Sequence, residues 1–223
     1  MIDQPTIYSK KQGFSALFLF LIVFLLAFLH GFALMSDLPS ALIGSVNFVF
    51  PFFDIIALVF FLKVFKENAA SIGLQLKTFK QGMFWGFVFL CLQLVFYFGV
   101  SYLFNDGKKM IFGPINLVMI SLFFISAFAE EIIYRGYIET RLQGMISNRL
   151  LDSIVTAILF VLTHYPVKWM GGSPLNAISI PHLILLVTLH FTCSLAYRKS
   201  NCIWGAVLLH VLYNLGNAFF IFI

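Results

Sequence analysis

Charged side chains are scarce in this chain. Only 10% of the 223 residues are Asp, Glu, Lys or Arg, whereas a soluble protein carries roughly 25%. Hydrophobic residues make up 61% of the chain and aromatic residues 18%. A soluble domain of this size must wet its exterior and could not hide so much apolar surface. The composition therefore excludes a soluble enzyme, a disordered protein and a nucleic-acid-binding protein, and it predicts an integral membrane protein.

Cysteine and metal-binding motifs are also sparse. The three cysteines, Cys91, Cys193 and Cys202, show no C-x-x-C spacing. We expect them to be packing thiols rather than disulfides or zinc ligands. No H-E-x-x-H sequence indicates a zinc protease helix. The sequence shows no internal repeat and no second domain, so we expect residues 1–223 to form a single membrane domain.

What the chain does contain is a series of long apolar stretches. A stretch of about 20 such residues can cross a bilayer as a helix. The sequence predicts an all-α transmembrane bundle of about seven spans, with an eighth re-entrant segment as the alternative. The predicted spans lie near residues 14–35, 41–62, 82–104, 111–134, 150–166, 178–197 and 202–223.

The cationic residues predict the orientation of the bundle. With these spans, all but three of the 14 Lys and Arg fall on the side that holds the N-terminus; the exceptions are Lys108, Lys109 and Lys168. Cytoplasmic loops carry the excess of Lys and Arg in membrane proteins. We therefore expect a multi-pass protein of the cell membrane, embedded in lipid, with a cytoplasmic N-terminus.

The densest group of ionisable residues lies late in the fourth predicted span. It contains Glu130, Glu131 and Arg135. Residues four apart share a helix face, so Glu131 can pair with Arg135. Glu130 lies about 100° around the helix and lacks that partner. One carboxylate would be neutralised while its neighbour stays available for chemistry, although an interfacial charge cluster would give the same pattern.

Two later spans carry polar residues with helical spacing. Phe160 and His164 lie near the end of the fifth span, and His210 and Asn214 share a face of the seventh. A lone membrane histidine usually hydrogen-bonds between helices. At ~1.5 Å rise per residue, however, all of these groups fall at similar depths to Glu130, so they can meet.

The three motifs together resemble the CPBP family, which comprises CAAX proteases and bacteriocin-processing enzymes and is also called the Abi family. Its pattern is E-E-x-x-x-R, then F-x-x-x-H, then H-x-x-x-N, on successive helices. The match covers approximately residues 111–223. The resemblance implies an intramembrane endopeptidase with a membrane-associated peptide or protein substrate. The short loops are more similar to the prokaryotic members, which implies a prokaryotic plasma membrane and a role such as bacteriocin immunity.

The resemblance also implies roles for individual residues. Glu130 would be the general base and His164 would hold the same water. His210 and Asn214 would stabilise the oxyanion. Glu131 and Arg135 would support Glu130, and Phe160 would shape the cavity. These residues lie in one chain, so a monomer is sufficient for the site.

Metal use is open at this point. Glu130, His164 and His210 are the ligand types of a His₂Glu zinc site. The amide of Asn214 is a donor and suits an oxyanion role instead. We favour a mechanism with no cofactor and keep zinc as the alternative.

Other functions remain alternatives as well. One is a non-enzymatic immunity or scaffold protein that binds a peptide or a sensor kinase. Another is a small transporter, although the chain shows one acidic focus and no inverted repeat.

Three further polar residues in the predicted spans are not assigned to the site. Asp54 could line the cavity or pair with Asn47, in a structural or substrate-access role. His182 and His190 lie eight residues apart on one helix. That spacing is roughly 12 Å, too far for one metal ion, so we expect packing or cavity-lining histidines.

Overall fold

The computed structural model describes residues 8–36, 39–104, 110–170 and 179–222. Within these ranges the elements are α1 (Lys10–Met35), α2 (Ser40–Val64), the 3₁₀ turn η1 (Ala69–Ile72), α3 (Phe79–Phe104), β1 (Met110–Phe112), α4 (Leu117–Glu131), the π-helix η2 (Ile132–Ile138), α5 (Glu139–Leu142), α6 (Arg149–Leu162), α7 (Tyr165–Met170), α8 (Ile180–Ser200), α9 (Ile203–Phe219) and β2 (Phe220–Phe222). Six helical segments are long and apolar enough to cross a membrane, and α9 is a shorter apolar helix. The protein is therefore a polytopic helical bundle of about seven spans, as predicted.

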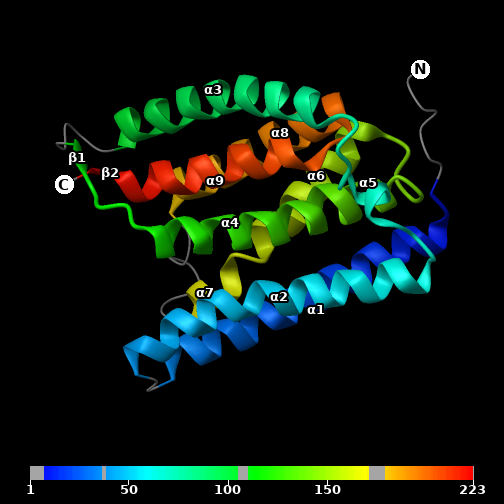
Figure 1. The fold of residues 1–223 in the computed structure, drawn as a ribbon, viewed down its shortest axis with the longest axis horizontal. Coiled ribbons are helices and arrows are strands. Elements are labelled where there is room, and N and C mark those ends of the chain that lie inside the picture. The colour runs from blue at the N-terminus through cyan, green and yellow to red at the C-terminus, as the bar shows by residue number, and fades with distance from the viewer. Residues whose placement is uncertain (1–7, 37–38, 105–109, 171–178, 223) are drawn as a thin grey trace.

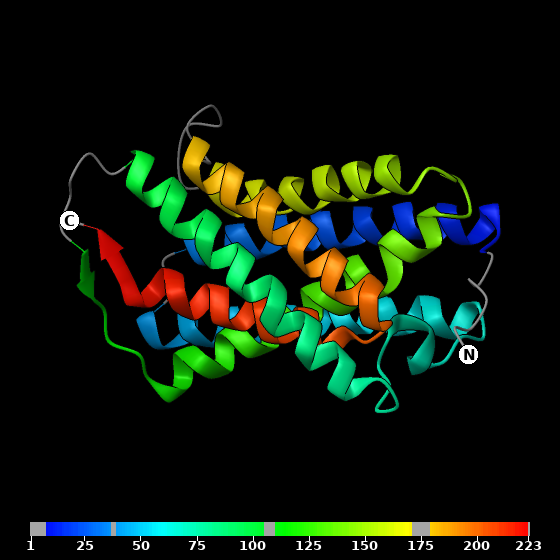
Figure 2. The ribbon, with the colours of Figure 1, turned by 90° about the horizontal axis from the view of Figure 1, so that it is seen from above.

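The helices form layers around α4. Figure 1 shows α1 and α2 together on one side of α4, and α3, α8 and α9 on the other. Seen from above, α3 runs alongside α8 and crosses over α9 (Figure 2). The helix that carries Glu130 and Glu131 is consequently enclosed on both sides, which is where burial of a charge is most costly.

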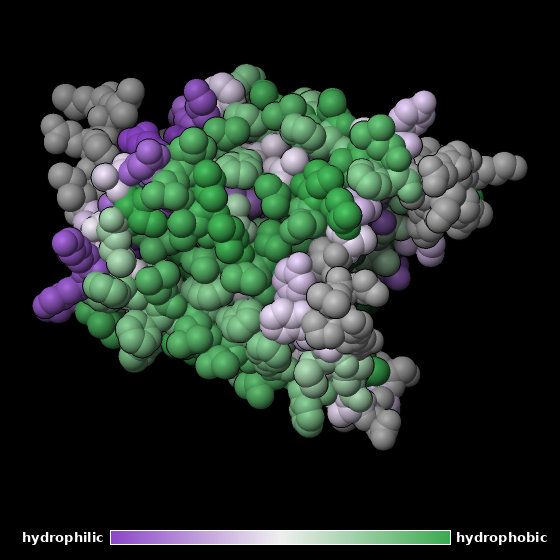
Figure 3. Space-filling view, turned by 180° about the vertical axis from the view of Figure 1, so that it is seen from behind, coloured by the Kyte–Doolittle hydropathy of each residue, from purple (hydrophilic) through white to green (hydrophobic). Residues whose placement is uncertain are grey.

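Hydrophilic residues gather at one end of the bundle. Figure 3 shows a broad hydrophobic face with the most hydrophilic side chains near one edge. The chain reverses direction from helix to helix, so α1 and α6 begin at this end, and α2 and α8 finish there. We call it the basic end, because Lys10, Lys66, Arg149 and Lys199 lie there.

Two predicted span boundaries differ from the structure. The fourth span begins at Leu117 rather than near residue 111, and the last helix ends at Phe219 rather than running to residue 223. The cause is an antiparallel pairing of β1 with β2, in which Phe112 lies opposite Phe220. These short strands satisfy their backbone groups with each other at the end of the bundle opposite the N-terminus.

Local sequence explains where the site-bearing helices begin. Asn116 caps α4 by accepting from the Met119 amide, and Asn148 caps α6 in the same way. Ser179 caps α8, with Pro181 in the first turn, where its missing amide hydrogen costs nothing. Capping residues therefore set the register of three of the helices around the site.

An arginine at the basic end joins the N-terminal helices to the rest. Arg141 is fully buried and pairs with Glu67, which follows α2. Its guanidinium also lies over the rings of Tyr8 and Tyr137, at 4.6 and 4.5 Å from their centroids. Gln12 of α1 donates to the other oxygen of Glu67 at 2.7 Å. Through Glu67, the loop after α2 is therefore bound to both α1 and α5.

Glycines bring α3 and α9 into backbone contact. A Cβ atom placed on Gly205 would lie 2.1 Å from the Gly82 carbonyl oxygen, and one on Gly86 would lie 2.4 Å from the Gly205 oxygen. Only residues without a side chain allow this approach, as in the small-residue contacts of membrane helices.

We expect Gly205→Ala to lower the thermal midpoint of the protein in detergent, because the added methyl group must push α3 and α9 apart. Overpacking of this kind costs about 1–3 kcal/mol. Gly99→Ala is the matched control, since a Cβ there meets nothing within 4 Å. Equal midpoints for the two variants would contradict the close contact.

Candidate active site

The two glutamates that end α4 differ in their surroundings. Glu131 is fully buried, and its Oε1 lies 3.0 Å from Nη1 of Arg135. The side chain of Glu130 is 33% exposed and lies on the neighbouring face. The structure therefore places the predicted pair together and leaves Glu130 without an arginine partner.

Directly after the glutamates the helix widens into the π-helix η2. Every residue of η2 is buried, and Gly136 contacts the loop at η1, where a Cβ would lie 2.8 Å from the Ile72 carbonyl oxygen. A π-helix is rare and is usually found at functional sites. The regular helix expected from the sequence is thus interrupted at the acidic motif.

His210 faces both glutamates. It is buried on α9, and its Nδ1 lies 2.7 Å from Glu131 Oε1. A carboxylate only accepts, so Nδ1 carries a hydrogen and donates it. The other nitrogen, Nε2, lies 4.0 Å from Glu130 Oε2. Glu131 therefore fixes the orientation of the ring while Nε2 stays available.

His164 approaches the same oxygen from another helix. Its Nε2 also lies 4.0 Å from Glu130 Oε2. Its Nδ1 lies 2.8 Å from the Phe160 carbonyl oxygen, so Nδ1 again carries the hydrogen. We expected His164 to lie within a helix. It lies instead in the turn between α6 and α7. Pro166 explains the break, because it has no amide hydrogen to continue the helix.

Phe160 lies at the centre of these groups. It is fully buried, and its ring centroid is 4.9 Å from that of His164 and 6.3 Å from that of His210. The Arg135 guanidinium lies 4.6 Å from the same centroid. One aromatic ring thus contacts a side chain from each of the three motifs.

Asn214 lies one turn after His210 on α9 and is half-buried. Within the described part of the chain, no hydrogen bond joins its amide to Glu130, His164 or His210. Its role therefore stays a prediction.

Two residues near the site were not assigned to it from the sequence. His190 is fully buried, and its ring centroid lies 5.6 Å from that of Phe160. Asp54 of α2 interacts electrostatically with Glu130. Asn47, one suggested partner of Asp54, bonds His30 Nε2 through its Oδ1 at 2.9 Å, and no hydrogen bond between Asp54 and Asn47 is found in the described residues. For His190, the i, i+4 spacing to Ser194 was a signal in the sequence that could have indicated a polar pair on one helix face. The position of Asp54 near Glu130 could not be predicted, because it depends on the packing of α2 on α4.

The arrangement gathers three acceptors around one volume. Glu130 Oε2 makes no hydrogen bond within the described residues, and the two Nε2 atoms facing it are unprotonated in neutral rings. Such a set can orient a water through its hydrogens and remove a proton from it. The residue types of this set, two histidines and a glutamate, also match a His₂Glu metal site. Among the described residues, however, no group of three His, Cys, Asp or Glu is arranged to hold a metal ion.

An apolar cavity of about 360 Å³ lies among α6, α7 and α8, and His164 is not one of the residues that line it. It is lined by α6, α7 and α8, including Val161, Tyr165, Trp169 and Val187. Tyr165 follows His164 directly in the sequence, and α8, which carries His190, contributes Leu183, Val187 and Phe191 to the lining.

The comparisons with known proteins identify the region that carries this geometry. Residues 112–216 match the family model "Type II CAAX prenyl endopeptidase Rce1-like". No curated protein and no solved structure gave a match. The match runs from β1 to α9 and contains Glu130, His164 and His210 with their neighbours. This part of the chain is therefore similar to CAAX proteases, in agreement with the resemblance of its motifs to the CPBP family.

Proposed function

We propose that the protein hydrolyses a peptide bond of a membrane-associated peptide or protein, with Glu130 as the general base. The observation that carries the proposal is the convergence of His164 Nε2 and His210 Nε2 on Glu130 Oε2, each at 4.0 Å. Glu130 and His164 would hold the attacking water, and Glu130 would take its proton.

The hydrogen bond from His210 to Glu131 defines what His210 can contribute. Because Nδ1 donates to the carboxylate, Nε2 can donate to an oxyanion only when the ring is an imidazolium. Glu131 would stabilise that cation, as a buried carboxylate orients and stabilises a catalytic histidine elsewhere. Asn214 would supply a second donor. Arg135 would pair with the Glu131 carboxylate, and Phe160 would hold the rings in place.

The apolar cavity suits the lipid-soluble part of a substrate. Its walls are hydrophobic, and two of its lining residues, Leu162 and Tyr165, are close to His164 in the sequence. A substrate anchored there by an apolar chain or side chains would present its peptide bond near Glu130. The substrate would therefore be recruited from the membrane rather than from solution.

We expect Glu130→Gln and His164→Ala to lower kcat roughly 100- to 10,000-fold, the usual contribution of a positioned base. The measurement uses the full chain in lipid nanodiscs and a set of fluorescence-quenched peptides carrying a farnesyl or palmitoyl anchor. His30→Ala is the control, since His30 bonds Asn47 away from the site. Undiminished cleavage by both site variants would defeat the proposal, and intact cellular function without any cleavage would favour the scaffold alternative.

We also expect the purified, active protein to keep its activity in a chelator, because the proposed mechanism uses no metal. The metal content per chain should be measured by mass spectrometry beside the activity. One tightly held zinc ion per chain, lost together with activity, would replace the metal-free mechanism with a zinc site formed by Glu130, His164 and His210.

Filling the cavity should weaken substrate binding without slowing chemistry. Val187→Phe replaces a small lining side chain with a larger aromatic ring that would fill part of the cavity. Burial of one apolar side chain contributes about 1.5–3 kcal/mol, so we expect KM to rise by roughly tenfold while kcat is retained. Leu195→Phe on the same helix is the control, because Leu195 is exposed and does not line the cavity. Equal KM values in the two variants would rule out this binding site.

A further inference from the structure

A buried arginine outside the three motifs contacts the segment that follows the two glutamates. Arg141 of α5 is fully buried and pairs with Glu67. Its Nη1 lies 2.6 Å from the Gly136 carbonyl oxygen and 3.1 Å from the Ser71 carbonyl oxygen, and its Nη2 donates to Ser71 Oγ at 2.8 Å. A guanidinium is costly to bury unless its charge and its donors are satisfied. The side chain is therefore fixed in one place by bonds to η1, to η2 and to the loop after α2.

The Gly136 carbonyl belongs to the π-helix η2. In η2 the Glu139 amide bonds the Tyr134 carbonyl, which is five residues back rather than the four of an α-helix. Two side chains donate to the Gly136 carbonyl, namely Arg141 through Nη1 and Thr140 through Oγ1 at 2.7 Å. Side-chain donors of this kind satisfy carbonyl groups where the regular backbone ladder is interrupted. Arg141 therefore stabilises the wide form of the helix.

The wide form sets the angle between the residues on its two sides. Residues eight apart, such as Glu131 and Glu139, lie about 80° apart around a regular α-helix. A π-helix takes up one additional residue, or about 100° of rotation, which brings the two carboxylates to within about 20° of one face. The contacts agree, because Arg135 pairs with Glu131 at 3.0 Å and its charge also interacts with Glu139.

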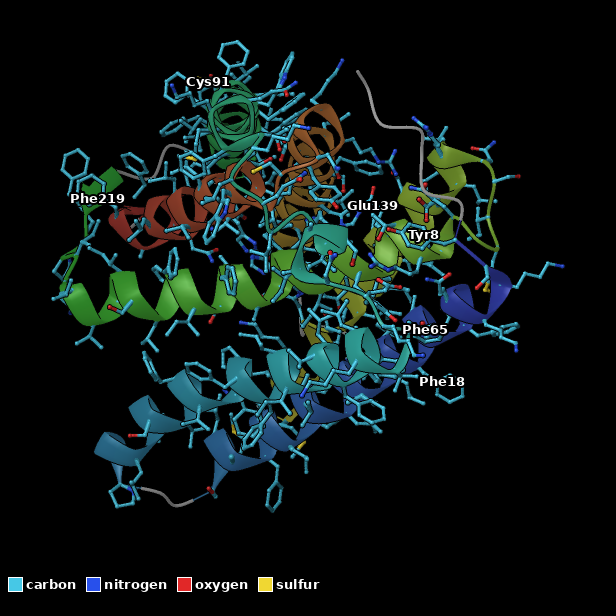
Figure 4. All side chains as sticks on the ribbon, turned by 45° about the vertical axis from the view of Figure 1, so that its right-hand side comes forward. Tyr8, Phe18, Phe65, Cys91, Glu139 and Phe219 are labelled. Carbon is cyan, nitrogen blue, oxygen red and sulfur yellow. The ribbon has the colours of Figure 1, made fainter. Side chains whose placement is uncertain are left out.

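The two sides of η2 are bound to different helices. Before η2, Phe128 stacks on Trp204 of α9 with ring centroids 5.7 Å apart, and Glu130 follows two residues later. After η2, Glu139 lies near the basic end (Figure 4), where it accepts a hydrogen bond from Ser194 of α8 at 2.7 Å. With Glu139 held there, a return of η2 to a regular α-helix would turn α4 by about 100°. Phe128 would leave Trp204, and Glu130 would turn away from the histidines.

We propose that Arg141 is a positioning residue for Glu130. Its bond to the Gly136 carbonyl keeps η2 in the π form, and this form holds α4 at the angle at which Glu130 Oε2 faces His164 and His210. The ion pair with Glu67 keeps the charge of Arg141 compensated but does not itself act on η2. The effect on catalysis rests on the proposed function, whereas the angle of α4 does not.

The variants separate the bond to Gly136 from the ion pair with Glu67. Arg141→Met keeps an extended side chain but removes every donor, and Glu67→Gln in the same chain avoids an unpaired buried carboxylate. Glu67→Gln alone is the matched control, because Arg141 then keeps its bond to Gly136. Thr140→Val removes the other donor to the Gly136 carbonyl without changing the charge, so it tests the same bond if the Arg141 variant does not fold.

The first measurement is ¹⁹F NMR of the full chain in lipid nanodiscs, with 5-fluorotryptophan at its three tryptophans, Trp85, Trp169 and Trp204. We expect the Trp204 resonance to shift in Arg141→Met/Glu67→Gln and in Thr140→Val, because the Phe128 ring moves away from it. The other two resonances should stay in place. Glu67→Gln should shift none of the three.

Thermal midpoints show which variants are folded. An unchanged Trp204 resonance in the folded variants would overturn the positioning role. An equal shift in Glu67→Gln would overturn it as well, since the ion pair rather than the bond to Gly136 would then control α4.

The second measurement is peptide cleavage by the same variants. We expect kcat to fall roughly 10- to 100-fold in Arg141→Met/Glu67→Gln, the effect of misplacing a catalytic group by about 1 Å. KM should be unchanged, because the apolar cavity lies on α6, α7 and α8. Arg141→Lys, which restores a charged donor, should recover part of the loss.

Full kcat together with a shifted Trp204 resonance would overturn the effect of the α4 angle on catalysis. The two proposals fail in different ways. If the unaltered protein cleaves no peptide, the proposed function is wrong, and the Trp204 resonance still decides whether Arg141 sets the angle of α4.

Discussion

The candidate site depends on one buried carboxylate, Glu131. It lies in a helix enclosed on both sides, where an isolated charge is strongly disfavoured. Arg135 compensates the charge, and His210 donates its Nδ1 hydrogen to it. Because these two partners occupy Glu131, the adjacent Glu130 keeps a free oxygen toward the histidines. Removing the charge of Glu131 would release His210 and leave Arg135 as the uncompensated group, so Glu131 determines the geometry around Glu130.

The π-helix shows how the fold accommodates this concentration of buried charge. From Glu131 to Glu139 every residue is buried, and the segment contacts α1, α2, η1, α6, α8 and α9. Gly136 allows the loop at η1 to approach, and Arg141 donates to the Gly136 carbonyl at 2.6 Å. A side chain therefore supplies part of the hydrogen bonding that a regular helix would take from its own backbone. The irregular segment is stabilised from the basic end, by contacts outside the catalytic motifs.

Much of this structure could be predicted from the sequence, because its strongest signals are local. The length of the apolar stretches predicted the membrane spans, and the i, i+4 spacing predicted the pairing of Glu131 with Arg135. The misses have tertiary causes. The strand pair needs Phe112 and Phe220 to meet across the chain, and the π-helix depends on contacts with η1. His190 was expected to be a packing or cavity-lining histidine, but the sequence did not indicate that Phe160 would be its neighbour, because only packing brings α6 and α8 together.

The helices outside the family match complete the surroundings of the site. Residues 112–216 supply Glu130, His164 and His210, whereas α1, α2 and α3 precede the matched region. Yet α2 packs on α4 and carries Asp54 into electrostatic range of Glu130, and α3 packs closely on α9, which holds His210. Under the proposed function, a substrate that reached Glu130 from the side of α2 would meet Asp54, a carboxylate that the family motifs do not include. The residues of the proposed chemistry lie in the matched region, while the side chains that surround Glu130 also come from α2, outside it.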